Sequence, residues 1–205
     1  MIGLKNLKNK IDLKSYPSIE AQIASISDDI AYNNHDIQDG FNANIFKINE
    51  LKEINFFNEI LKRYSSKFKK TNNRILIYQM VRDSINLMVK DLIKNSLINF
   101  KLNKINKLND VYNSENKLVC FSSNYENTIN EIRDFLSFKM YKNNKVLKKN
   151  NEGRRIIEKL FKAISRNPRK FLTFSTNKHN KYRSIADYIS GMTDRFAINI
   201  YKSLK

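Results

Sequence analysis

The sequence is poor in the residues that break or cross-link a chain. Its 205 residues contain 4 glycines, 2 prolines and 1 cysteine. So few glycines and prolines exclude collagen-like and disordered low-complexity chains, and they favour long helices over a fold of many strands and turns. A single cysteine excludes a disulfide within the chain and a cysteine-based zinc cluster. Cys120 lies between Val119 and Phe121, and we predict that it is a small buried hydrophobic residue rather than a nucleophile.

Long apolar runs and histidines are also scarce. The sequence has no span of 18 apolar residues, and its first residues lack the apolar core of a signal peptide. We therefore expect a soluble cytoplasmic protein without membrane contact. It also lacks the glycine-rich phosphate loops GxGxxG and GxxxxGK[ST]. Only His35 and His179 could supply imidazole ligands.

Acidic residues are outnumbered by basic ones. Lys and Arg number 38 against 20 Asp and Glu, a net charge of +18. Residues 141–183 alone hold 14 basic and 2 acidic residues. This run is interpreted either as a surface facing a polyanion, such as nucleic acid or nucleotide phosphates, or as a solvated helix face exaggerated by base composition.

Apolar residues recur at helical intervals along most of the chain. The pattern predicts helices at 19–40, 46–64, 74–100, 124–142, 152–165 and 182–204. Ser18 is the expected N-cap of the first helix and Gly40 its C-terminal stop, while Gly191 is expected to allow close helix approach. Residues 1–16 form a polar N-terminal segment, and residues 101–120 are expected to be a loop. The fold class is an all-α helical bundle.

The first predicted helix carries an unusual density of polar groups. Six such residues occur within twelve positions: Asp28, Asp29, Tyr32, His35, Asp36 and Asp39. Asp28, Tyr32 and Asp36 are spaced i, i+4 and i+8, so they line one face, beside a face expected to bury Ile23, Ile26 and Ile30. Two like charges on one stripe require compensation by water, a basic neighbour or a divalent cation. The alternative is a solvated acidic face.

Two long motifs, in the same order as in a known family, carry a resemblance. The first comprises Pro17-Ser18-Ile19-Glu20-Ala21-Gln22-Ile23-Ala24 and Asp28-Asp29-Ile30-Ala31-Tyr32-Asn33-Asn34-His35-Asp36-Ile37-Gln38-Asp39-Gly40. The second is Arg183-Ser184-Ile185-Ala186-Asp187-Tyr188-Ile189-Ser190-Gly191-Met192-Thr193-Asp194-Arg195-Phe196-Ala197. Weaker similarity lies between them, at 134–141, 156–161 and 167–168. The chain from residue 17 onward resembles the bacterial dGTPase-like deoxynucleotide triphosphohydrolases of the HD-domain superfamily.

The resemblance implies an all-α HD-type fold that commonly oligomerises, so a homo-oligomer is expected. It implies hydrolysis of a dNTP to deoxynucleoside and tripolyphosphate. Asp28 matches the family's final metal ligand, and Tyr32 and Asp36 match catalytic positions beside the substrate sugar and phosphates. Five residues of the closing motif would contact phosphate or a neighbouring subunit: Arg183, Asp187, Tyr188, Asp194 and Arg195. Alternatively, Asp187, Asp194 and Arg195 would only orient their helix against the core.

The departure from the family concerns the metal. The family's other ligands, a His and a His-Asp pair, lie upstream of the stretch that matches residue 17, and the first sixteen residues contain no histidine. His35-Asp36 follows the final-Asp position on the same helix, so the resemblance does not make it the metal-binding pair. His35 is expected to be a polar neighbour of the site, and His179 a loop residue. Asp28 alone would bind a divalent metal such as Mg²⁺ or Mn²⁺ weakly or not at all.

The chain therefore resembles the C-terminal half of such an enzyme, with residues 17–205 as its part of the domain. It would be a subunit whose N-terminal half is a separate chain, a repurposed piece or a gene remnant. A second hypothesis is a non-catalytic module that binds single-stranded DNA through residues 141–183, with four aromatic residues as candidates for base stacking: Tyr141, Phe171, Phe174 and Tyr182. A third is a structural remnant that exposes apolar surface where the missing half would pack.

Overall fold

The structure is a computed structural model that describes residues 15–65, 72–172 and 181–204. Within these ranges every regular element is a helix, which confirms the predicted all-α class. The chain forms two compact units, Met1–Tyr141 and Lys142–Lys205. In the described ranges no helix is both long enough and apolar enough to cross a membrane. The predicted boundary after residue 16 stays a prediction.

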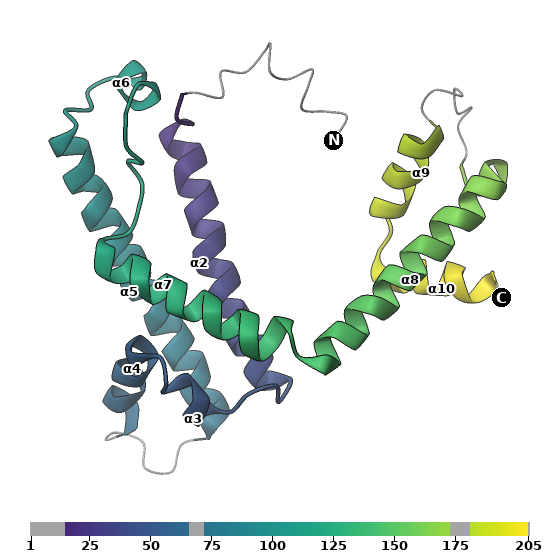
Figure 1. Cartoon of the computed structure of the whole chain (residues 1–205), viewed down its shortest axis with the longest axis horizontal. Helices are drawn as coiled ribbons and strands as arrows, with labels where there is room; N and C mark the ends of the chain where they lie inside the picture. The colour runs from purple at the N-terminus through teal and green to yellow at the C-terminus, as the bar shows by residue number, and fades with distance from the viewer. Residues whose placement is uncertain (1–14, 66–71, 173–180, 205) are drawn as a thin grey trace. The chain divides into compact units, whose positions relative to one another are not determined.

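The first unit is built around two long helices (Figure 1). Its elements are α2 (Ile19–Asn42), α3 (Ile48–Leu51), α4 (Asn55–Ser65), α5 (Asn73–Leu102), α6 (Leu108–Tyr112), α7 (Ser123–Leu136) and the π-helical turn η1 (Ser137–Tyr141). α2 packs against α5 and α7, and α4 packs against α5. Their contacts bury a core whose largest members include Ile37, Phe57, Met80, Met88 and Leu136. Ser18 caps α2 as predicted, because its hydroxyl accepts the Ala21 N–H at 3.4 Å.

The second unit has a smaller core of its own. Its elements are α8 (Asn144–Arg166), the 3₁₀ turn η2 (Pro168–Lys170), α9 (Lys181–Ser190) and α10 (Asp194–Ser203). α8 packs against α9 and α10. The buried residues are Leu160, Ile164, Ile185, Ile189 and Ala197. One face of α8 therefore faces the core, which leaves the opposite face to solvent.

Several helix boundaries differ from the predictions. The segment 46–64 is two helices, because the chain turns between Leu51 and Asn55. Leu51 and Ile54 are both buried, so the apolar pattern continues across the turn and does not reveal it. The segment 182–204 is likewise divided, into α9 and α10. Thr193 begins α10 by accepting the Phe196 N–H at 3.3 Å.

The structure also contains more helix than the apolar pattern predicts, in two polar segments. α8 starts at Asn144 rather than 152, because the side chain of Asn143 caps it and its first two turns are polar. The expected loop 101–120 contains the short helix α6, in which Asp110 accepts the Lys107 N–H at 3.1 Å. Polar segments of this kind form helices through their caps, which apolar periodicity does not detect.

The glycines act differently from expectation. Gly40 does not stop α2, which continues to Asn42; a Cβ at this position would overlap the buried ring of Phe46. Gly40 is therefore required by close packing. For Gly191, which directly follows α9, the prediction of close helix approach is wrong, since a Cβ there would make only ordinary contacts, with carbonyl oxygens of α9 at 3.5 and 3.7 Å.

Cys120 is half-buried rather than fully buried. Its sulfur accepts the side-chain N–H of Asn99 at 3.2 Å, and Asn95 donates to the Cys120 carbonyl at 3.0 Å. The residue therefore joins α5 to the segment before α7 through polar contacts as well as packing.

Candidate active site

α2 is the platform for the predicted site. Its Ile26 and Ile30 are buried as expected, whereas Ile23 is 46% exposed, which corrects the prediction that it lies in the core. Asp28 and Tyr32 point away from the core and are exposed, Tyr32 to 59%. Asp36, two turns further along, is half-buried. The i, i+4, i+8 stripe thus runs from solvent at Asp28 toward a partly enclosed position at Asp36.

Asp36 contacts a residue far away in the sequence. The hydroxyl of Tyr141, the last residue of η1, donates a hydrogen bond to Oδ2 of Asp36. Burial, followed by this hydrogen bond and the negative charge of Asp36, raises the pKa of Tyr141 well above its usual value of 10. Tyr32 adds to the same shift, so the three side chains form one polar cluster at the junction of α2 and η1.

The π-helical geometry of η1 bears on this contact. η1 directly continues α7, and π-helical turns within helices occur often at functional sites. Lys139, also in η1, pairs with Glu50 at 2.8 Å, so this turn is fixed to the first unit at two places. η1 therefore holds Tyr141 at the half-buried end of the stripe.

A second acidic residue of α2 has a basic partner. Oδ2 of Asp29 lies 3.0 Å from Nη2 of Arg133 in α7, with both side chains about half exposed. Arg133 therefore compensates the charge of Asp29, which lies beside the stripe formed by Asp28, Tyr32 and Asp36. For Asp36 the partner is the phenol hydroxyl of Tyr141 and not water, a basic neighbour or a cation.

The described residues do not by themselves fit a catalytic divalent cation. Asp28 is the predicted ligand, yet no cluster of three or more His, Cys, Asp or Glu residues able to hold a metal occurs in the described ranges. A catalytic metal centre has about three protein ligands and an open position. His35 is exposed on α2, and His179 lies outside the described residues.

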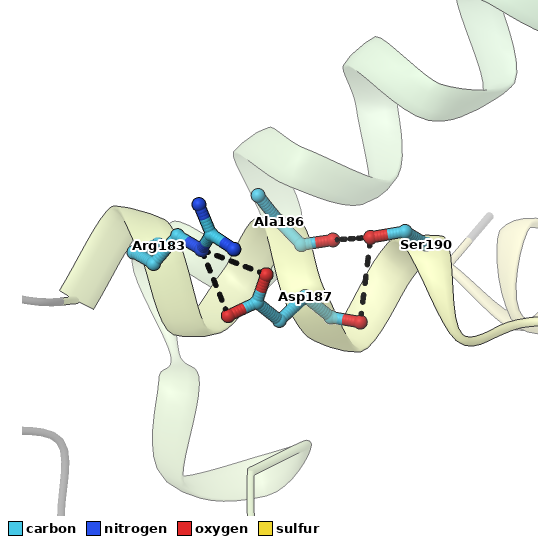
Figure 2. Close-up of polar contacts among 4 residues, drawn as sticks. All are labelled: Arg183, Ala186, Asp187 and Ser190. Carbon is cyan, nitrogen blue, oxygen red and sulfur yellow. Dashed lines mark hydrogen bonds and ion pairs between the residues drawn. The ribbon is translucent and has the colours of Figure 1, made fainter. Parts of the chain in front are cut away.

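The closing motif lies in the second unit, on α9 and the start of α10. Figure 2 shows Arg183 and Asp187 facing each other one turn apart, with Nε and Oδ1 at 2.9 Å. The hydroxyl of Ser190 donates to the Ala186 carbonyl. Both charged side chains are mostly exposed, so their pairing leaves them accessible to a ligand and contributes little to stability.

The remaining residues of that motif divide between packing and exposure. Tyr188 is half-buried and packs against the core of the second unit. Asp194 and Arg195 are exposed in the first turn of α10. Asp194 there faces the positive end of the helix dipole. These positions belong to the second unit, whereas the α2 stripe belongs to the first.

The sequence predicts Tyr141 only as a base-stacking candidate, whereas in the structure its hydroxyl contacts Asp36. The similarity at 134–141 carries no signal for this contact, because the two residues are 105 positions apart. Of the other stacking candidates, Phe171 packs partly buried against the second core, Tyr182 stacks on Phe161 with centroids 6.1 Å apart, and Phe174 lies outside the described residues.

The comparisons with known proteins cover the whole chain. A family model described as a phosphohydrolase-associated domain matches residues 119–203. A deoxyguanosinetriphosphate triphosphohydrolase-like protein of Pelagibacter ubique (strain HTCC1062) is 55% identical over 204 residues, which are 100% of this chain and 55% of the relative. Proteins of the same name from Rickettsia typhi and Rickettsia canadensis are 38% and 36% identical, over 97% of this chain and 53% and 54% of their own lengths.

These relatives confirm the resemblance that the motifs indicated, and their name describes a hydrolase family. The chain spans about half the length of the curated relatives it matches. An HD-type hydrolase family also suggests a divalent metal, although the described residues hold no complete set of ligands. Together with the motif on α2 and the closing motif, these relatives show that this chain is similar, along nearly its whole length, to about half of the deoxyguanosinetriphosphate triphosphohydrolase-like proteins.

Proposed function

We propose that this chain carries the substrate-facing part of a dNTP triphosphohydrolase site, whose product pair is a deoxynucleoside and tripolyphosphate. The observation that carries the proposal is the cluster of Asp36, Tyr32 and Tyr141 at one end of the α2 stripe. The name of the relatives supports the substrate class, with dGTP as the first nucleotide to test.

Each member of the cluster has a role that its chemistry suits. Tyr141 occupies Oδ2 of Asp36, which leaves Oδ1 to accept a hydrogen bond from a hydroxyl of the substrate sugar. The hydroxyl of Tyr141 is protonated at neutral pH, as in any tyrosine, and the raised pKa keeps it a hydrogen-bond donor above pH 10 as well. Tyr32 is exposed and one turn from Asp36, where its hydroxyl can donate to a phosphate or sugar oxygen.

Asp28 would supply one contact to a divalent metal, and residues outside this chain would supply the remaining ligands. The relatives extend beyond the stretch that they share with it, since the 55% identical relative matches all of this chain with 55% of its own length. A complete site would then be formed when that additional part packs against the first unit.

An apolar groove between α2 and α5 is the surface on which we expect that part to pack. The groove is lined by Ile23, Ser27, Ile30, Val89, Leu92, Ile93, Ser96, Leu97, Phe100 and Val119. Ile93 and Leu97 are 55% and 54% exposed and lie one turn apart, which suits an amphipathic helix laid along α5. Ser27 lines the groove and directly precedes Asp28, so an occupant of the groove would reach the metal position.

The activity is tested with a chimera in which this chain replaces the matched part of the Pelagibacter relative. We expect this chain alone to release little or no tripolyphosphate from dGTP with Mg²⁺ or Mn²⁺, and the chimera to release it at a rate comparable with that of the relative. Asp28→Ala and Asp36→Asn should each lower kcat of the chimera at least tenfold, while Glu131→Gln, an exposed carboxylate of α7, should not. A folded but inactive chimera beside an active relative, or equal loss in the control, contradicts the proposal.

A separate measurement tests the groove. Replacing Ile93 and Leu97 by Asp should leave the unfolding temperature of this chain nearly unchanged and reduce its aggregation, because both side chains already contact water. The same pair of changes should lower the unfolding temperature of the chimera by several degrees. Ile98→Asp, an exposed α5 position outside the groove, is the control and should not lower it. Equal tolerance of all three changes in the chimera would show that the groove has another occupant or none.

A further inference from the structure

A buried hydroxyl lies in the apolar groove between α2 and α5, two helices that pack side by side (Figure 1). Ten described residues line this hollow of about 300 Å³; eight of them are apolar and two are serines. Ser27 is exposed and reaches water, whereas Ser96 is only 7% exposed. The hydroxyl of Ser96 is buried and has no hydrogen-bond partner among the described residues. The groove therefore holds an unsatisfied hydroxyl as well as apolar surface.

A second buried serine of α5 shows the contrast. Ser84 is fully buried, and its hydroxyl lies 3.9 Å from the sulfur of Met88, so it has a weak partner within the chain. Ser96 lacks such a partner, and a buried hydroxyl that has lost its hydrogen bonds to water without gaining another destabilises the fold. Because most buried polar groups in proteins are paired, an unpaired one that borders a groove indicates that an occupant of the groove supplies its partner.

The residues around Ser96 have the spacing of a seam between two helices. Val89, Ile93, Ser96 and Phe100 are separated by four, three and four positions, which is the a/d spacing of helices that pack along their lengths. From Val89 to Phe100 the seam extends about 17 Å at 1.5 Å per residue, which is about three helical turns. Val89 and Ile93 are 38% and 55% exposed, so this part of α5 is open to a second helix of similar length.

We propose that an amphipathic helix of about three turns packs in this groove, and that a hydrogen bond from Ser96 fixes its register against α5. The inference rests on the proposed function, because the helix would belong to the additional part of the relatives, of which one matches this chain with only 55% of its own length. A side chain with a hydrogen-bond acceptor, such as Asn or Gln, would lie opposite Ser96. A single polar pair in an apolar seam specifies one register, because any shift leaves both groups buried and unpaired.

The register matters because the groove reaches the proposed metal position. Ser27 lines the groove, and Asp28 follows it directly on α2. A shift of the packed helix by one turn would move its side chains by about 5.4 Å, which is more than twice the length of a metal–oxygen bond. Ser96 is therefore a positioning residue, which acts on the site through the helix that it holds.

The test compares one substitution in this chain alone and in the chimera with the Pelagibacter relative. In the chain alone, Ser96→Ala removes an unpaired hydroxyl, so we expect the unfolding temperature to rise by about 2 °C. In the chimera the same change leaves the partner of Ser96 unpaired, so the unfolding temperature should fall by about 2 °C. The higher helix propensity of alanine contributes equally in both proteins and does not affect the difference between them.

Ser84→Ala is the matched control, because it removes a buried hydroxyl of the same helix whose contact lies within this chain. It should shift the unfolding temperature by the same amount in the chain and in the chimera. A kinetic measurement separates positioning from packing. With dGTP, Ser96→Ala should lower kcat of the folded chimera at least fivefold and change KM less than twofold, whereas Ser96→Thr, which keeps the hydroxyl, should retain most of kcat.

Two results would overturn the proposal. Shifts of the same sign for Ser96→Ala in the chain and the chimera would mean that the hydroxyl has a partner in both proteins or in neither. A dimer of this chain that Ile93→Asp dissociates would assign the groove to a second copy. The unfolding temperatures do not depend on hydrolysis, so opposite shifts in an inactive chimera would support this contact and contradict only the proposed triphosphohydrolase activity.

Discussion

The hydroxyl of Tyr141 donates to a carboxylate oxygen of Asp36, and so joins η1 to the acidic stripe of α2 across 105 positions of sequence. The contact gives Asp36 one fixed partner and leaves its second oxygen available. It also fixes the end of the first unit, since Tyr141 is the last residue of that unit.

Removing this hydroxyl should destabilise the first unit. We expect Tyr141→Phe to lower the free energy of unfolding by about 1 kcal/mol, because a hydrogen bond to a charged group is lost while the ring is kept. Urea unfolding followed by circular dichroism measures the change. Tyr78→Phe is the control, since Tyr78 is an exposed tyrosine of α5. If the two variants are equally stable, the hydrogen bond contributes nothing in solution.

The raised pKa of Tyr141 predicts a loss of stability at alkaline pH. The folded state keeps this phenol protonated above pH 10 while the unfolded chain loses the proton, so the unfolded state binds fewer protons and stability falls as pH rises. Tyr64, which donates to Asp83 at 2.6 Å, and Tyr125 also have raised pKa values and add to the effect. Unfolding temperatures measured from pH 9 to 11 should fall less steeply in Tyr141→Phe than in the unmodified chain. Parallel curves would refute the assignment.

The ion pair between Lys139 and Glu50 predicts the opposite dependence at acid pH. The hydrogen bond from Lys139 holds the pKa of Glu50 below 4.5, so the stabilisation is present above that pH and is lost as pH falls through the lowered value. In Glu50→Gln we expect a slightly lower unfolding temperature at pH 7 and a shallower decline between pH 5 and 3. The exposed Glu131, changed to Gln, serves as the control. An unchanged acid limb in Glu50→Gln would contradict this role.

The two helical glycines should respond in opposite directions to alanine. Gly40→Ala places a methyl group against the ring of Phe46, which is buried and lies edge-on to Phe135 with centroids 5.1 Å apart. The overlap should cost about 1 to 3 kcal/mol of unfolding free energy, more than the gain in helix propensity. At Gly153 of α8 no atom lies within 4 Å of the added Cβ, so Gly153→Ala should stabilise by up to about 1 kcal/mol. Chemical denaturation of both variants tests the pair, and destabilisation at both sites would refute the packing argument.

Local patterns in the sequence determined the fold class of this protein and several features of its first long helix. The scarcity of glycine and proline and the helical spacing of apolar residues predicted an all-α chain, and the Ser18 cap and the common face of Asp28, Tyr32 and Asp36 followed from helix geometry alone. These features depend on residues within a few positions of each other, so they arise in a helix whatever packs around it. The two long motifs indicated the resemblance to the dGTPase-like proteins because each motif is a contiguous stretch of sequence.

The tertiary structure decided what those patterns left open. Only the packing of α7 and η1 against α2 brings Tyr141 to Asp36. Ile23 has the same helical spacing as the buried Ile26 and Ile30, and only the shape of the α2–α5 surface leaves it exposed. The break between α3 and α4 was hidden for the same reason, since Leu51 and Ile54 are buried on both sides of it. Contacts between residues distant in sequence depend on how helices pack against each other. A periodicity of three to four residues shows which face of a helix is buried, but not which other helix packs on that face.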